Sequence, residues 1–176
     1  MAIMVQECFV YIGTYTRRTK SEGIYIYRQD LATGQLSPAG VAQVPDSPAF
    51  VVPHPTGRYL YAVSEVGGFG GQAAGGVKAF SVDAQTGALA LLNEQSSGGP
   101  GPCHVSVDKT GQYLLVANYS GGSVAMLPIN EDGSLEPASD FHQHQGAGAD
   151  PRRQEGPHAH SIWPDPDNRY ALVPDL

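Results

Sequence analysis

The chain has 176 residues, of which 41% are hydrophobic, and this is enough apolar surface for one packed globular domain. Lys and Arg number 10 against 17 Asp and Glu, so the formal net charge is −7. The sequence contains no basic run that could follow a phosphate backbone, and nucleic acid is therefore excluded as an expected partner.

Cysteine usage and the N-terminal residues predict the compartment. Cys8 and Cys103 are the only cysteines and show no Cys-x-x-Cys spacing, which argues against a disulfide framework and a structural zinc site. Residues 1–10 place Glu7 inside a short apolar stretch and lack a basic region followed by an apolar one, so no signal peptide is expected. No segment approaches the roughly 18 apolar residues of a membrane span. We therefore expect a cytoplasmic protein without a membrane partner.

In chain order, the first clear feature is a repeat. Residues 47–65 align without a gap to residues 101–119, so that Gly57 meets Gly111, and a third copy begins at Gly156. The 22 Gly and 14 Pro fall between apolar runs, as in a turn-rich all-β chain. No helical period competes with this pattern.

A second element recurs between these copies, running from a Gly through an alternating apolar strand to a Gly-x-Leu turn. Glycine suits the positive φ of a short hairpin loop, and Asp-Gly and Thr-Gly contexts favour such loops. Each repeat therefore contains two hairpins, or four strands. The three turns are residues 33–36, 86–89 and 132–135.

Four short antiparallel strands recurring every 45–55 residues or so indicate the blade of a β-propeller. With the strands of a blade lettered a to d from the central channel outward, we predict b-c-d in blade 1 (8–45), which opens with strand b at 9–15. Blades 2 (46–98) and 3 (99–150) each hold a-b-c-d, and blade 4 (155–176) begins with a-b. The predicted fold class is all-β: one partial propeller domain over the whole chain.

A ring closes with typically four to eight blades, so a little over three blades cannot close alone. We expect about half of a ring, in which a longer chain supplies the missing inner strand of blade 1 from its far C-terminus. Open strand edges are then available for association with other chains.

Polar residues accumulate on the predicted inner strands, where a propeller holds its ligands. Blade 2 has Ala49-Phe50 at the positions where blade 3 has Cys103-His104. In blade 4 the corresponding segment begins at Pro157 and contains two His. Together with the residues just before it, this segment (150–161) holds two Arg, one Glu and two His, and is the best site candidate.

His158 and His160 are two residues apart, so their imidazoles share one side of an extended strand. One could act as a general base or donor while the other orients it, and we predict both as catalytic. The predicted substrate-binding residues are Arg153, Glu155, His104 and Glu65.

Simpler interpretations stay open for each of these residues. His-x-His is also a metal-ligand pattern, but no third ligand follows at a convincing spacing, so no metal is expected. Either His could cap a strand end, and His104 could be a packing residue. Arg152 and Arg153 could be a solvated pair in a loop, and Glu65 could be solvated as well.

Two further motifs are interpreted structurally. His142 and His144 form a second His-x-His on an outer strand and are expected to be surface residues. The Gly-rich segment 66–71 does not lead from a strand into a helix, as a phosphate-binding loop would, and is expected to be a flexible b–c loop.

Residues 11–16 and 54–61, and above all 153–161, resemble the lactonase, seven-bladed β-propeller family. The resemblance covers nearly the whole chain. It implies a seven-bladed ring of about twice this length that hydrolyses or forms the lactone ring of an anionic sugar acid or muconate, without a cofactor.

The resemblance also implies a site with a His from a Pro-His-x-His-Ser strand, matching His158 or His160. The Arg and Glu that accompany it belong to the next blade, in the slots that Cys103 and Tyr119 occupy in blade 3, and these slots fall after Leu176. A muconate-type cyclase or isomerase, a non-catalytic propeller that binds a ligand or protein, and a half-ring scaffold remain as alternative functions.

Overall fold

The computed structural model describes residues 6–176, and every regular element in that range is a β-strand, thirteen in all. Residues 1–5, which belong to the segment predicted not to be a signal peptide, lie outside the described residues. In the part of the chain described, no helix is long and apolar enough to cross a membrane.

The strands form four antiparallel sheets, which we number as blades 1 to 4 in chain order. Blade 1 contains β1 (Glu7–Ile12), β2 (Gly23–Asp30) and β3 (Leu36–Gln43). Blade 2 contains β4 (Val51–Pro53), β5 (Tyr59–Ser64), β6 (Gly76–Val82) and β7 (Leu89–Ser96). Blade 3 contains β8 (Pro102–Val107), β9 (Tyr113–Asn118), β10 (Ser123–Pro128) and β11 (Asp140–Gln143). Blade 4 contains β12 (Trp163–Pro164) and β13 (Ala171–Leu172).

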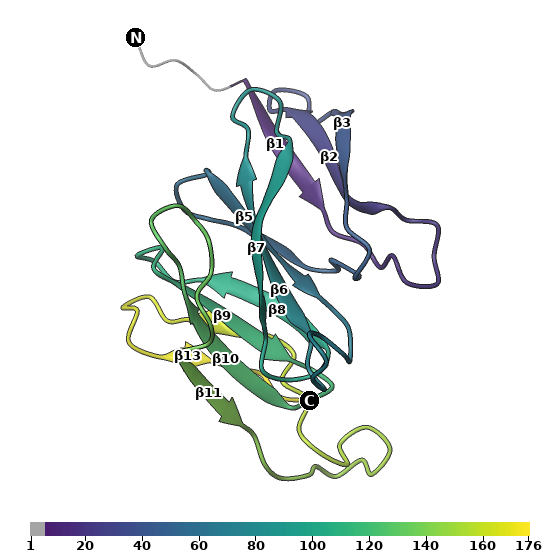
Figure 1. Ribbon diagram of the computed structural model, residues 1–176, viewed down its shortest axis with the longest axis vertical. Helices are drawn as coiled ribbons and strands as arrows, with labels where there is room; N and C mark the ends of the chain where they lie inside the picture. Colours follow the sequence, from purple (N-terminus) through teal and green to yellow (C-terminus); the bar gives the residue numbers. More distant parts are fainter. Residues whose placement is uncertain (1–5) are drawn as a thin grey trace.

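The sheets follow one another in space as they do in sequence (Figure 1). Blade 1 lies at one end, and β13 lies beside β9 and β10 at the other. One boundary differs from the prediction: β1 ends at Ile12 instead of residue 15. Gly13 then passes so close to Pro48 that a Cβ atom would lie 2.3 Å from the Pro48 carbonyl oxygen, and the chain leaves the sheet there.

The predicted hairpin turns are confirmed by the backbone. Gly34, Gly87 and Gly133 occupy the same place in three successive blades and have φ angles of 75°, 73° and 85°. These are left-handed conformations that glycine adopts without steric cost.

The core lies between blades. β5 is buried at every residue and β9 at all but its first, whereas the outer strands β3, β7 and β11 are largely exposed. A middle strand packs against a neighbouring blade on both faces, so it is almost continuously apolar instead of alternating.

Candidate active site

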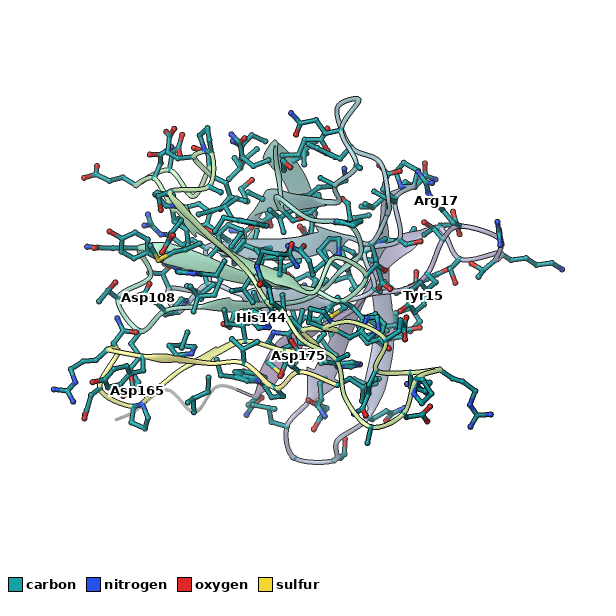
Figure 2. All side chains as sticks on the ribbon, turned by 90° about the horizontal axis from the view of Figure 1, so that it is seen from below. Tyr15, Arg17, Asp108, His144, Asp165 and Asp175 are labelled. Carbon is teal, nitrogen blue, oxygen red and sulfur yellow. The ribbon has the colours of Figure 1, made fainter. Side chains whose placement is uncertain are left out.

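One end of the inner strands gathers most of the predicted site residues. Glu65 follows the end of β5, Tyr119 follows the end of β9, and residues 158–160 precede β12. In Figure 2 Asp108 and Asp165, which stabilise the a–b turns, lie on the side of the molecule opposite Tyr15.

Those two aspartates define how blade 4 aligns with blade 3. Oδ1 of Asp108 accepts hydrogen bonds from the backbone N–H groups of residues 112 and 113, and Oδ1 of Asp165 does the same for residues 169 and 170. The same shift sets His160 in the place of Cys103, 57 residues earlier. The counterpart of Pro102 is therefore Ala159 and not Pro157, which corrects the sequence alignment because an insertion precedes the inner strand of blade 4.

His160 of blade 4 is near enough to Glu65 of blade 2 for its charge to act on the Glu65 carboxyl. The Cys103 thiol donates to the His160 carbonyl oxygen, with Sγ 3.4 Å from O, and the Tyr15 hydroxyl donates to Oε1 of Glu65 at 3.1 Å. Burial raises the pKa of Glu65, while the Tyr15 hydrogen bond and the charge of His160 oppose that rise. The site therefore places a carboxyl that holds its proton more tightly than usual near an exposed imidazole.

Cys103 belongs to the same cluster but is a poor nucleophile. Burial and then the nearby Glu65 carboxylate raise the pKa of its thiol to about 11. The reactive form of cysteine is the thiolate, so this side chain stays protonated near neutral pH.

His158 is held from several directions. Its ring stacks on that of Tyr119 with centroids 4.6 Å apart and an angle of 18° between the planes. Nδ1 lies 3.1 Å from the Tyr119 carbonyl oxygen, and Nε2 lies 3.5 Å from Oε1 of Glu155. The backbone N–H of His158 donates to Oδ1 of Asp175 at 2.6 Å. The rings of both histidines therefore lie against that of Tyr119, His158 stacked on it and His160 edge-on to it.

Arg153 lies in an exposed turn just before this segment. Its backbone N–H donates to the Asp150 carbonyl oxygen at 3.1 Å, and Arg152 lies 3.8 Å from the Asp150 carboxylate. Among the residues described, the Arg153 guanidinium has no ion pair recorded. It is therefore available to an anion from solvent.

His104 is placed elsewhere, in the packing between blades. It is 4% exposed, and its ring lies 4.4 Å from Phe50 and 4.6 Å from Trp163, centroid to centroid. Nδ1 accepts the backbone N–H of Ile162 at 3.3 Å. Burial, and then the charge of His160, lowers the pKa of His104 to about 4. This neutral, enclosed ring matches the packing interpretation and not the predicted contact with substrate.

The structure also adds residues that sequence reasoning had not selected. Tyr15 belongs to the 11–16 motif, and Tyr119 occupies in blade 3 the repeat position that Glu65 occupies in blade 2. Both residues could therefore have been selected from the sequence. His142 is exposed, whereas His144 is half-buried and its Nδ1 lies 2.5 Å from Oδ2 of Asp175 (Figure 2). No group of three or more His, Cys, Asp or Glu side chains suited to a metal ion occurs within residues 6–176.

Comparison with known proteins agrees with this architecture. The Bacillus subtilis (strain 168) protein named 6-phosphogluconolactonase is 39% identical over 166 residues, which are 94% of this chain and 46% of that protein. A solved Bacteroides fragilis protein superposes with a TM-score of 0.87 at 37% identity, covering 97% of this chain and 46% of that one. The periplasmic gluconolactonase of Pseudomonas aeruginosa gives a TM-score of 0.85 at 35% identity, over 97% and 47% of the two chains.

The chain thus spans about half the length of the curated relatives it matches, and the expected partial propeller is confirmed. Residues 9–176 match the family described as "Lactonase, 7-bladed beta-propeller". The chain belongs to this lactonase family of seven-bladed β-propellers.

Proposed function

We propose that this chain supplies half of a site that hydrolyses the lactone of an anionic sugar acid. The observation that carries the proposal is the exposed His160 at the same end of the inner strands as Glu65, where its charge acts on the Glu65 carboxyl. Relatives named 6-phosphogluconolactonase and gluconolactonase support this choice of substrate class.

His160 would remove a proton from water as the water oxygen bonds to the lactone carbonyl carbon. The carbonyl oxygen becomes an oxyanion, which donors from other blades of the ring would stabilise. The bond between that carbon and the ring oxygen then breaks, and the ring oxygen takes a proton and becomes a hydroxyl of the free acid. No cofactor takes part in these steps.

Substrate binding is divided between opposite charges. Arg153 suits the phosphate or carboxylate of the substrate, because a guanidinium can donate two parallel hydrogen bonds to such a group. Glu65 and Glu155 are hydrogen-bond acceptors for sugar hydroxyls, and their negative charge disfavours the substrate anion at their own positions.

Lactone hydrolysis in a chain completed to seven blades tests the proposal. We expect 6-phosphogluconolactone to be hydrolysed well above its spontaneous rate, and His160→Gln to lower kcat about 100-fold or more. His142→Gln, which changes an exposed His on β11, is the matched control and should leave kcat unchanged. Wild-type activity on a muconate lactone instead would favour a cyclase, and no activity on either would favour a binding propeller.

Arg153 is tested by comparing two substrates. Arg153→Ala should raise KM for the phosphorylated lactone about tenfold and change KM for the uncharged gluconolactone little. Arg152→Ala is the control, since this side chain already lies near Asp150. Equal effects of the two substitutions on both substrates would remove Arg153 from the site.

The two free thiols, Cys8 and Cys103, favour the cytoplasm, which is reducing, over the periplasm. Cell fractionation of the native protein followed by immunoblotting tests this placement, and recovery in a periplasmic fraction would contradict it.

A further inference from the structure

The two histidines of the 158–160 segment have different surroundings. Both nitrogens of His158 face acceptor oxygens, at 3.1 Å from the Tyr119 carbonyl and 3.5 Å from the Glu155 carboxylate. A carbonyl oxygen only accepts, so Nδ1 of His158 carries a proton. With its other nitrogen facing a carboxylate and its side chain only 15% exposed, His158 leaves neither ring nitrogen open to a substrate water.

Within residues 6–176, no hydrogen bond or ion pair holds the ring of His160. Its backbone N–H donates to the Pro174 carbonyl oxygen at 3.0 Å, which fixes the main chain, while the residue itself is exposed. The aromatic ring against it is that of Tyr119, met edge-on with centroids 5.4 Å apart and an angle of 90° between the planes. The orientation of the His160 imidazole therefore depends on where the Tyr119 ring stands.

Tyr119 is in turn held in place by His158. The stacked His158 ring covers one face of the phenol, and the Tyr119 backbone N–H donates to the Gly101 carbonyl oxygen at 2.8 Å. Asp175 extends this support outward, since its Oδ1 accepts the His158 backbone N–H and its Oδ2 faces His144 from the segment after β11.

We propose that His158 and Tyr119 are positioning residues that orient His160, and that His160 alone of the two histidines touches the substrate. The inference rests on the proposed lactone hydrolysis. The His158 ring stacks on the Tyr119 phenol and fixes it, and the phenol in turn restricts the edge-on imidazole of His160. This orientation lowers the entropic cost of reaching the reactive geometry.

The first test compares conservative and truncating substitutions of Tyr119 and His158 in the seven-bladed chain. Tyr119→Phe keeps the ring and should retain kcat within about threefold, whereas Tyr119→Ala should lower kcat about tenfold with KM nearly unchanged. His158→Asn keeps a donor for the Tyr119 carbonyl oxygen and should lose less kcat than His158→Ala. Loss in His158→Asn as large as in His160→Gln would overturn the proposal, as would full activity in Tyr119→Ala.

The second test needs no activity and uses the chain itself. Nitrogen-15 NMR of the imidazoles should show a proton on Nδ1 of His158, and Tyr119→Ala should shift the ring signals of both histidines. A bare Nδ1 on His158, or a His160 ring signal that does not respond to Tyr119→Ala, would contradict the positioning role. If the NMR result holds while the wild-type seven-bladed chain lacks lactonase activity, the proposed function fails and the geometry stands.

Discussion

The phenol of Tyr61 in blade 2 is completely buried and donates a hydrogen bond to the carbonyl oxygen of Gly133 in blade 3, with O to O at 3.1 Å. Tyr11 in blade 1 does the same to Gly87 in blade 2 at 2.9 Å. The tyrosine of a middle strand thus reaches the c–d turn of the next blade. This repeated bond joins neighbouring blades, and the burial of the phenol raises the pKa of Tyr61.

Tyr61→Phe should destabilise the chain by about 1–2 kcal/mol, because the Gly133 carbonyl oxygen is left buried without its donor. Tyr11→Phe is the matched change at a less buried site and should cost less. Urea denaturation followed by fluorescence measures both. Equal losses in the two variants would mean that burial does not set the strength of the bond.

Gly133→Ala should be more damaging than Gly34→Ala, although both residues occupy the same turn position. Both have positive φ, which costs about 1 kcal/mol for alanine. A Cβ on Gly133 would lie 2.3 Å from the Tyr59 ring, whereas none of the described atoms lies within 4 Å of the one on Gly34. We expect about 3 kcal/mol against 1. Similar unfolding midpoints for the two variants would show that blades 2 and 3 do not pack as described.

His104 should make stability depend on pH. The folded state keeps its pKa near 4, below the ordinary value of 6.5, so the unfolded chain binds the proton first as the pH falls. Stability contributed by neutral His104 is therefore present above pH 6.5 and lost as the pH falls toward 4. By pH 5 the loss should be about 2 kcal/mol.

His104→Phe keeps a ring between Phe50 and Trp163 and removes this titration. The variant should lose less stability than the wild type between pH 7 and pH 5 in urea titrations. His142→Phe, at an exposed position, should leave the pH dependence as it is. A pH dependence unchanged by His104→Phe would assign the titration to another group.

Tyr15→Phe should move the acidic limb of the rate profile of the seven-bladed chain to higher pH, by less than about one unit. The Tyr15 hydrogen bond lowers the pKa of Glu65, and its removal lets burial raise that pKa further. Glu65 must then lose its proton at a higher pH before it can serve as an acceptor. Lactone hydrolysis between pH 4 and 8 checks this, and in a Glu65→Gln background Tyr15→Phe should no longer move the limb. A Tyr15→Phe profile that coincides with that of the wild type would show that the protonation of Glu65 does not affect the rate.

The blades were predictable because a blade is a local unit. Its strands pair with their neighbours in sequence, so the gapless match of 47–65 to 101–119 and the turns at Gly34, Gly87 and Gly133 already define the hairpins. The third copy was misaligned by two residues, since Asp165, which identifies the turn after its inner strand, carries no glycine signal like that of Gly111.

The side on which His104 lies could not be predicted in the same way. The pairing of β8 with β9 is interrupted between Pro102 and His104, so the alternation of side chains changes there. Counting residues along the strand therefore cannot say whether Cys103 or His104 faces the central channel.

The sequence by itself determined the strands and their turns, because these depend on apolar patterns and glycine positions within some fifty residues. The family entered as a resemblance carried by motifs such as residues 153–161. Only the tertiary structure decided which polar residues meet. Glu65 and His160 come from blades that are not neighbours in the chain, and the packing of the blades brings them within reach of each other's charge. The rings of His158 and His160 contact Tyr119 for the same reason, because packing between blades and not spacing along a strand sets these distances.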